Sequence, residues 1–168
     1  MAYYIIIRGP AGVGKTTIGK LLAEKINAGI TDFDRVMDEL GMDYIEGEKW
    51  IPLHKFLKAD EVMFPKFEKD LNDGRNIVLD GNFYHKEQIK DLEKKLKFPH
   101  LVFTLKANLK DCIVRDKTRP NVLGEKAIRD VFALVSAFDY GIDIDTRNKN
   151  QNKIVEEIYS AITNILKV

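Results

Sequence analysis

Short apolar runs alternate along the chain with longer segments that carry an apolar residue every three or four positions. The apolar runs predict buried β-strands, and the longer segments predict amphipathic α-helices. The expected strands are Tyr3–Arg8, Gly29–Phe33, Asn76–Leu79, Leu101–Leu105 and Tyr140–Ile144. The expected helices are Gly14–Asn27, Glu87–Leu96, Glu125–Phe138 and Lys153–Leu166. This alternation is typical of an α/β fold built on a parallel sheet.

The stretch from Gly41 to Gly74 interrupts the alternation. It contains several aromatic residues together with Pro52 and Pro65, and the prolines predict two short helices with a break between them. Because the stretch lies between the second and third expected strands, it stands beside the edge of the sheet where open α/β folds bind ligands. We therefore expect an insertion that covers an acceptor pocket.

The composition is that of one globular domain, because the 168 residues are 45% hydrophobic and 32% charged. The net charge of +1 gives no general attraction to nucleic acid or to a membrane surface. The single cysteine, Cys112, excludes a disulfide framework. No apolar run approaches the length of a membrane span or has the form of a signal peptide, so we expect a cytoplasmic protein without a membrane partner.

One motif carries specific chemistry. Residues Gly9–Thr16 match the phosphate-binding loop, G-x-x-x-x-G-K-[ST], between an apolar strand and an amphipathic helix. Its glycines let backbone N–H groups turn toward phosphate oxygens, Lys15 can reach the outer phosphates, and the Thr16 hydroxyl suits a magnesium ion. We therefore expect ATP and Mg²⁺ as cofactors. The expected nucleotide-binding residues here are Gly9, Pro10, Ala11, Gly12, Val13, Gly14, Lys15, Thr16 and Thr17.

Asp80 directly follows an apolar strand and is a candidate for the magnesium side of the site. Because the carboxyl ends of parallel strands meet at one edge of a sheet, Asp80 can face the phosphate loop. The expected metal set is Thr16, Asp80 and Asp32. The next residue is Gly81, where many NTP-hydrolysing proteins of this class carry a glutamate that activates water. The absence of that glutamate favours phosphoryl transfer to an acceptor over hydrolysis.

A second polar cluster, Asp32-Phe33-Asp34-Arg35, follows the second expected strand. Transfer to a hydroxyl requires a group that accepts its proton, and either Asp32 or Asp34 can do so. Arg35 can bind an anionic or polyhydroxylated acceptor. Asp34 also suits the N-cap of a helix that begins at Arg35, and this structural role is compatible with a catalytic one.

Two arginines, Arg115 and Arg119, are four residues apart, which on a helix places both on one face. They precede Pro120 and Gly124, and we interpret residues 115–125 as a lid that closes on the nucleotide. Their positive charge would stabilise the charge that spreads over the transferring phosphoryl oxygens. The alternative is a surface ion pair of little energetic weight.

Taken in order, Gly9–Thr16, Asp32-x-Asp34, Asp80-Gly81-Asn82, Arg115-x-x-x-Arg119 and Tyr140–Thr146 resemble the P-loop small-molecule kinases. That group includes shikimate, gluconate and adenylate kinases, and the chain is most similar to the predicted ATP-binding kinases allied with the 5′-hydroxyl polynucleotide kinases. The resemblance implies a P-loop NTPase fold with a five-stranded parallel sheet in the order 2-3-1-4-5, a lid, and Mg-ATP as the donor. It also implies that Asn82 contributes to the acceptor site and that Asp145 and Thr146 lie beside the adenine.

Two sub-patterns of that group compete after the second strand. Asp32-x-x-Arg35 resembles the polynucleotide kinases, in which the aspartate is the general base and the arginine holds an acceptor-side phosphate. Asp32-x-Asp34 resembles shikimate kinase, in which the second aspartate holds the acceptor hydroxyl. The chain has neither the Gly-Gly-Gly acceptor loop of shikimate kinase nor the Pro-Arg continuation after Asp80-Gly81 that is typical of adenylate kinases. The substrate of neither kinase can therefore be transferred to this chain.

The sequence therefore predicts a single-domain, Mg-ATP-dependent phosphotransferase that spans residues 1–168 and acts on a hydroxyl of a small metabolite. One alternative acceptor is the 5′-hydroxyl of a nucleic acid, or a nucleoside or nucleotide. An alternative from another class is a nucleotide-binding regulatory protein with slow ATP hydrolysis.

Overall fold

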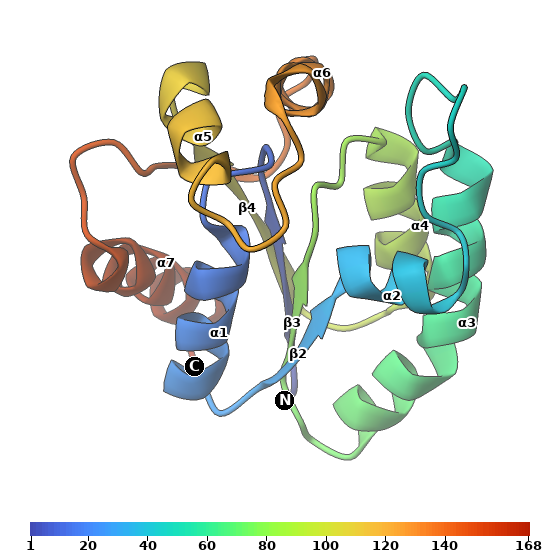
Figure 1. Ribbon diagram of the computed structural model, residues 1–168. Coiled ribbons are helices and arrows are strands. Elements are labelled where there is room, and N and C mark those ends of the chain that lie inside the picture. The colour runs from blue at the N-terminus through green and yellow to red at the C-terminus, as the bar shows by residue number, and fades with distance from the viewer.

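The computed structural model describes residues 1–168 and is built around a sheet of five parallel strands. The strands are β1 Tyr4–Arg8, β2 Gly29–Asp32, β3 Ile77–Asp80, β4 His100–Lys106 and β5 Ile142–Asp145. Their order across the sheet is β2-β3-β1-β4-β5, and each neighbouring pair is parallel (Figure 1). The α/β fold and the strand order expected from the sequence are confirmed.

Helices cover both faces of this sheet (Figure 1). They are α1 Lys15–Lys25, α2 Phe33–Glu39, α3 Leu53–Asn72, α4 Lys86–Lys95, α5 Leu109–Asp116, α6 Glu125–Ser136 and α7 Gln151–Leu166. Helices α1 and α7 pack side by side on one face, and α3 and α4 pack side by side on the other. Helices α5 and α6 stand at the end of the sheet where the strands finish, and α2 follows β2 at that same end. No helix combines the length and the apolar character needed to cross a bilayer.

Strand β1 is buried along its whole length because helices cover both of its faces. Its side chains alternate between two hydrophobic cores. Ile5 lies in one core with Leu22 of α1, and Ile6 lies in the other with Phe67 of α3. The sheet centre is therefore rigid, and the phosphate loop begins at the end of its most buried strand.

The expected pair of short helices between Gly41 and Gly74 was wrong. The first part of this stretch has no helix, and α3 then runs for 20 residues with Pro65 inside it. A proline removes one hydrogen bond and disturbs one turn, which does not end a helix whose flanking turns are anchored. Phe56 before the proline and Phe67 after it are both buried in the same core, so burial holds the two halves in one helix.

Candidate active site

A large open cavity lies where the strands end, between the phosphate loop, α2 and α6. Its volume is about 1850 Å³, which exceeds what one small ligand requires. The predicted site residues that line it are Ala11, Gly12, Val13, Gly14, Lys15, Thr16, Thr17, Asp34, Asn82, Arg115, Arg119 and Thr146. The predicted site residues outside its lining are Gly9, Pro10, Asp32, Arg35, Asp80 and Asp145. The fold thus brings together residues from five separate segments of the chain.

The conformation of the phosphate loop depends on two glycines with positive φ. Gly12 has a φ of +82°, and a Cβ at this position would stand 2.6 Å from the carbonyl oxygen of Cys112 in α5. Gly14 has a φ of +101° and is the N-cap of α1. The first N–H groups of a helix have no partner inside the helix, and the helix dipole adds positive character to them. Lys15, Thr16 and Thr17 carry these groups and line the cavity, which makes the loop an anion site.

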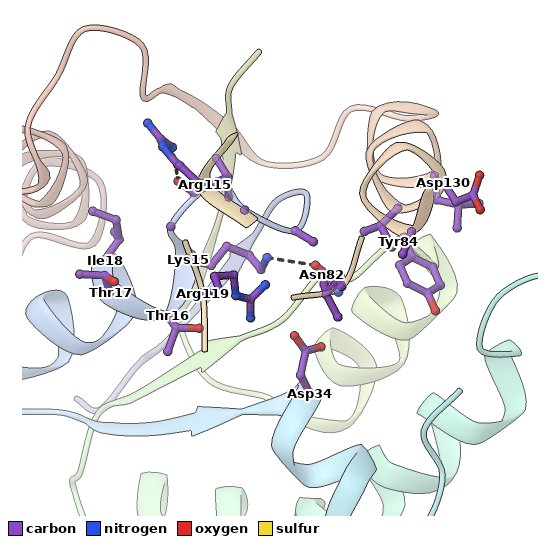
Figure 2. Close-up of a pocket in the computed structure, with 18 of the residues that line it drawn as sticks. Lys15, Thr16, Thr17, Ile18, Asp34, Asn82, Tyr84, Arg115, Arg119 and Asp130 are labelled. Carbon is purple, nitrogen blue, oxygen red and sulfur yellow. Dashed lines mark hydrogen bonds between the residues drawn. The ribbon is translucent and has the colours of Figure 1, made fainter. Parts of the chain in front are cut away.

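The Lys15 ammonium contacts only neutral acceptors. Its Nζ donates to the Pro10 carbonyl oxygen at 3.1 Å and to Asn82 Oδ1 at 3.0 Å, and only 7% of the residue is exposed (Figure 2). Neutral oxygens hold an ammonium in position without neutralising it, so its charge remains available to an anionic ligand. Asn82 therefore lies at the junction between the phosphate loop and the rest of the cavity.

Asp80 is buried at the end of β3, and its carboxylate oxygens make no well-formed hydrogen bond, although the Thr16 hydroxyl is close enough to lower the pKa of the carboxyl. Burial raises the pKa of Asp80 to about 6, while the nearby Lys15 ammonium opposes this rise. An unsatisfied buried carboxylate is costly, and a cation relieves that cost. Thr16 adds a hydroxyl oxygen at the start of α1, and hard cations prefer such oxygen donors. These residues fit a magnesium ion.

The two aspartates that follow β2 occupy different places. Asp32 Oδ1 accepts hydrogen bonds from the backbone N–H groups of Asp34 at 3.0 Å and Arg35 at 3.3 Å. Asp32 is therefore the N-cap of α2, and the expected cap at Asp34 was wrong. The physical reason is that β2 ends at Asp32, whose extended backbone (φ −89°, ψ 108°) suits a cap. Since this carboxylate is committed to the cap through one oxygen, only its other oxygen is free for a ligand.

Asp34 lies in the first turn of α2 and points toward the region between Lys15 and Asn82 (Figure 2). Asp34 is exposed to the open cavity, and desolvation by the cavity walls raises the pKa of its carboxyl while Lys15 opposes the rise. Arg35 lies outside the cavity, with 77% of its side chain exposed and its Nε 2.7 Å from Glu39 Oε1. Successive helical residues are rotated by about 100°, so Asp34 and Arg35 cannot both face the cavity.

Arg115 and Arg119 do not share a helical face, so the prediction that both lie on one face of a helix was wrong. Helix α5 ends at Asp116, and Arg119 lies beyond it in a turn. The backbone N–H of Arg119 donates to the Asp116 carbonyl oxygen at 3.1 Å. A proline disfavours helical geometry at the residue before it, and Arg119 directly precedes Pro120. Both arginines nevertheless line the cavity. Arg115 Nη1 donates to the Val13 carbonyl oxygen of the phosphate loop at 3.1 Å, and Arg119 points toward Lys15 and Asp34 (Figure 2).

A buried carboxylate fixes the loop that was predicted to act as a lid. Asp116 is 1% exposed, its Oδ1 accepts from the Leu123 N–H at 3.1 Å, and its Oδ2 accepts from the Gly124 N–H at 2.9 Å. These bonds close the loop that carries Arg119 onto the end of α5. Sequence reasoning missed this role because an aspartate beside an arginine looks like a surface ion pair.

The segment after β5 contributes one of its two predicted residues to the cavity. Thr146 is buried there, and its hydroxyl donates to the Lys106 carbonyl oxygen at 2.9 Å. Asp145 instead pairs with Arg147, whose guanidinium lies 2.7 Å from Asp145 Oδ2 and holds the pKa of that carboxyl far below its usual range. Asp145 is thus engaged by a neighbour outside the cavity.

Four further cavity residues carried no specific sequence signal, namely Asp43, Trp50, Tyr84 and Asp130. The Tyr84 hydroxyl accepts from the Ile51 N–H at 3.2 Å, which ties the irregular segment before α3 to the segment after β3. The position of residues 41–74 between the second and third strands predicted a cover for an acceptor pocket, but the pattern could not identify which side chains face inward.

Arg8, at the end of β1, is a second feature that sequence reasoning missed. It is fully buried, and its guanidinium donates to the Val135 carbonyl oxygen at 2.8 Å, the Thr104 hydroxyl at 3.1 Å and the Phe138 carbonyl oxygen at 3.4 Å. Burial lowers the pKa of Arg8 to about 10. The side chain therefore ties the carboxyl end of α6 to the strand that leads into the phosphate loop.

Comparison with known proteins gives consistent relatives. The model of the AAA-domain family matches residues 5–132. A "Putative adenylate kinase" of Pyrococcus abyssi is 32% identical over 164 residues, which cover 97% of this chain and 86% of that protein. A "Probable thymidylate kinase" of Methanococcus maripaludis is 30% identical over 192 residues, covering 96% of each chain. The solved structure of a sugar kinase from Janibacter sp. HTCC2649 has the same fold, with a TM-score of 0.74, 16% identity, and coverage of 95% of this chain and 94% of that chain.

Proposed function

The chain belongs to the AAA-domain family and is an ATP-dependent phosphotransferase, and from this premise we propose that it transfers the γ-phosphate of ATP to a hydroxyl of a small metabolite. The observation that carries the proposal is Asp34. Its carboxylate lines the cavity next to the lysine of the phosphate loop and is not used by the helix cap. A hydroxyl acceptor must lose a proton as it attacks, and a carboxylate in this place can take it.

The remaining residues divide between charge and position. The phosphate loop and Lys15 bind the donor phosphates, and Arg115 and Arg119 approach them from the lid side. Thr16 and Asp80 would hold Mg²⁺, and Asp32 stands next to Asp80 on the neighbouring strand. The ion, when bound, neutralises charge on the donor phosphates. Desolvation by the cavity walls raises the pKa of Asp34 toward the operating pH, which improves a carboxylate as a general base.

Acceptor-dependent release of ADP tests the proposal. The purified protein is supplied with Mg-ATP and a panel of sugars, polyols, nucleosides and 5′-hydroxyl oligonucleotides. We expect at least one small alcohol to accelerate ADP release and to appear as its phosphate ester in the products. Asp34→Asn should abolish this acceleration, whereas Asp38→Asn, an exposed position on the same helix that lies outside the cavity, should retain it.

The names of the relatives favour a second candidate, a nucleoside monophosphate kinase, in which the acceptor is a phosphate rather than a hydroxyl. AMP and dTMP in the same assay test it, with nucleoside diphosphate as the product. A 5′-hydroxyl nucleic acid kinase would need an excess of cations along the acceptor side, where the carboxylates Asp34, Asp43 and Asp130 outnumber the lysines Lys49 and Lys126. A regulatory protein with slow hydrolysis would release ADP at one rate with every acceptor and with none.

A further inference from the structure

The side chains around the acceptor end of the cavity carry information about the charge of the acceptor, on the premise of the proposed function. The acceptor end is the part of the cavity formed by α2, the segment before α3, the residues after β3, and α6. Its polar and aromatic lining includes Asp34, Asp43, Tyr44, Trp50, Tyr84 and Asp130. Figure 2 places Tyr84 and Asp130 together on the side of the cavity away from the phosphate loop.

The carboxylates at this end are largely uncompensated. Asp34 and Asp43 take part in none of the ion pairs of the chain. Asp130 has only a distant partner, with Lys126 Nζ 3.9 Å from its Oδ2. Glu48 also lines the cavity, but Lys55 neutralises it at 2.9 Å. The acceptor end therefore carries excess negative charge.

Two lysines at this end, Lys49 and Lys126, offset only part of the charge of Asp34, Asp43 and Asp130. Lys49 lines the cavity, and its ammonium lies over the Trp50 ring at 4.5 Å from the ring centre. Arg35 is turned out to solvent. Arg119 lies between the two ends of the cavity, where the transferred phosphoryl group would pass (Figure 2). No guanidinium is thus placed to grip a phosphate or carboxylate on the far side of the acceptor.

The hydrogen-bonding capacity of the lining, like its charge, disfavours an anionic acceptor. An ionised carboxylate can only accept hydrogen bonds, so a compound held by Asp34, Asp43 and Asp130 must supply donors. A phosphate monoester supplies acceptors and two negative charges, whereas hydroxyl and ammonium groups supply donors. The rings of Trp50 and Tyr84 add faces that can pack against the C–H groups of a sugar or attract an ammonium group.

We propose that the acceptor is a donor-rich alcohol without negative charge, either a neutral polyol or an amine-bearing one, and that phosphate monoesters such as AMP are excluded from the acceptor end. On this inference, the acceptor of this chain differs from the phosphate acceptors that the names of its relatives indicate. The donor end keeps the phosphate loop chemistry.

The binding of a two-ended ligand tests the exclusion without knowledge of the acceptor. Diadenosine pentaphosphate joins two adenosines through five phosphates and occupies both ends of an enzyme that accepts AMP. Its dissociation constant is compared by calorimetry with that of a non-hydrolysable ATP analogue, both with Mg²⁺. We expect the two constants to agree within ~3-fold, because only one adenosine is bound. Binding that is ~100-fold tighter than that of the analogue, the gain expected when two sites are linked, would overturn the inference.

A pair of charge variants sharpens this measurement. Asp43→Asn removes one charge from the acceptor end, and the matched control Glu68→Gln removes one from an exposed position of α3 outside the cavity. We expect Asp43→Asn to tighten diadenosine pentaphosphate relative to the ATP analogue and Glu68→Gln to leave that ratio unchanged. Equal ratios in both variants would contradict a role for the Asp43 charge.

Turnover with one sugar scaffold in four charge states separates the inference from the proposed function. Glucose, glucosamine, glucuronate and glucose 6-phosphate are supplied at equal concentration with saturating Mg-ATP. We expect ester formation only with the first two, and Asp43→Asn should raise the KM of glucosamine more than that of glucose. Preference for glucuronate or for the 6-phosphate would overturn the inference and leave hydroxyl transfer intact. If no alcohol on the wider panel is phosphorylated, the proposed function fails, while the two-ended ligand still decides the charge of the acceptor end.

Discussion

At the scale of single residues, the position of Lys15 is explained by a ligand rather than by the fold. Its ammonium is nearly buried and contacts only neutral oxygens, an arrangement that gives up hydration without gaining a counter-ion. We expect Lys15→Ala to lower turnover by ~100-fold or more while unfolding remains cooperative, because the variant loses charge stabilisation and no core packing. Steady-state kinetics with saturating ATP, beside a thermal melt, measures both. Retention of most turnover would show that the loop does not position the phosphates.

The two aspartates after β2 are separable by conservative substitution. Asparagine caps helices as well as aspartate does, so Asp32→Asn should keep both α2 and most of the turnover. Asp34→Asn removes the group that accepts the acceptor proton and should lower turnover by ~100-fold or more, with ATP affinity little changed. Acceptor-dependent ADP release and ATP titration of both variants give the comparison. If instead Asp32→Asn suffers the large loss, the base is the capping residue.

At the scale of elements, the strand and helix types followed from local pattern wherever one surface is buried. The run before the phosphate loop reads as a strand with both faces covered, and β1 is one. The pattern failed at Pro65 because the strength of packing on both sides of a proline is a tertiary property. It also failed after Asp116, where a spacing of four residues suggested one helical face but the backbone turns. Residue spacing alone does not determine where a helix ends.

Arg119 is held less closely than Arg115, because Arg115 donates to the carbonyl oxygen of Val13 whereas the acidic partner of Arg119, Asp116 Oδ1, is 3.9 Å away. Since the Arg119 contact would tighten as charge develops on the transferred group, Arg119→Ala should lower turnover more than it weakens ATP binding. Arg119→Lys should restore little, because a flexible point charge cannot reproduce a planar fork. Steady-state kinetics and direct ATP titration of both variants compare the loss of turnover with the loss of ATP affinity. Equal losses in binding and turnover would make Arg119 a uniform binder of ATP.

The lid loop itself depends on Asp116, which accepts the N–H groups of Leu123 and Gly124. Asp116→Asn replaces one acceptor oxygen with a donor that cannot pair with a backbone N–H. We expect faster hydrogen exchange at Leu123 and Gly124, together with a fall in turnover that exceeds any change in ATP affinity. Asp111→Asn, in the first turn of the same helix, is the control and should change neither. Unaltered exchange at both amides in Asp116→Asn would exclude the clamp.

At the scale of the whole molecule, the donor end of the site was predictable and the acceptor end was not. A phosphate loop, an aspartate after a strand and a pair of arginines have chemistry that depends on short local spacing or on the shared edge of a parallel sheet. Asp43, Tyr84 and Asp130 come from three separate segments of the chain, and all three line the cavity only when the segment before α3 lies beside it. Their convergence depends on long-range packing, such as the contacts that Arg8 makes with the end of α6, and no local pattern encodes it.

The packing of α3 on α4 also contains a titratable group that bears on the stability of the whole fold. Asp60 is fully buried, its Oδ1 accepts from Gln88 Nε2 at 3.1 Å, and its Oδ2 has no partner. Burial raises the pKa of Asp60 to about 8, the Gln88 hydrogen bond and Lys95 lower it, and Asp91 raises it. The carboxyl is therefore neutral in the folded protein at pH values where an unfolded chain ionises it.

This difference sets the sign of a pH dependence. Between pH ~4 and pH ~8 the folded state holds a proton that the unfolded state has released, so the free energy of unfolding falls as the pH rises. Urea denaturation without nucleotide at intervals from pH 5 to pH 8 should show this decline. Asp60→Asn keeps an acceptor for Gln88 and cannot ionise, so it should be more stable than the wild type at pH 8 and should lose less stability over this range. Because Asp80, with a pKa of about 6, titrates in both proteins, the comparison belongs in the upper half of the range, and parallel curves between pH 6 and pH 8 would show that Asp60 does not titrate there.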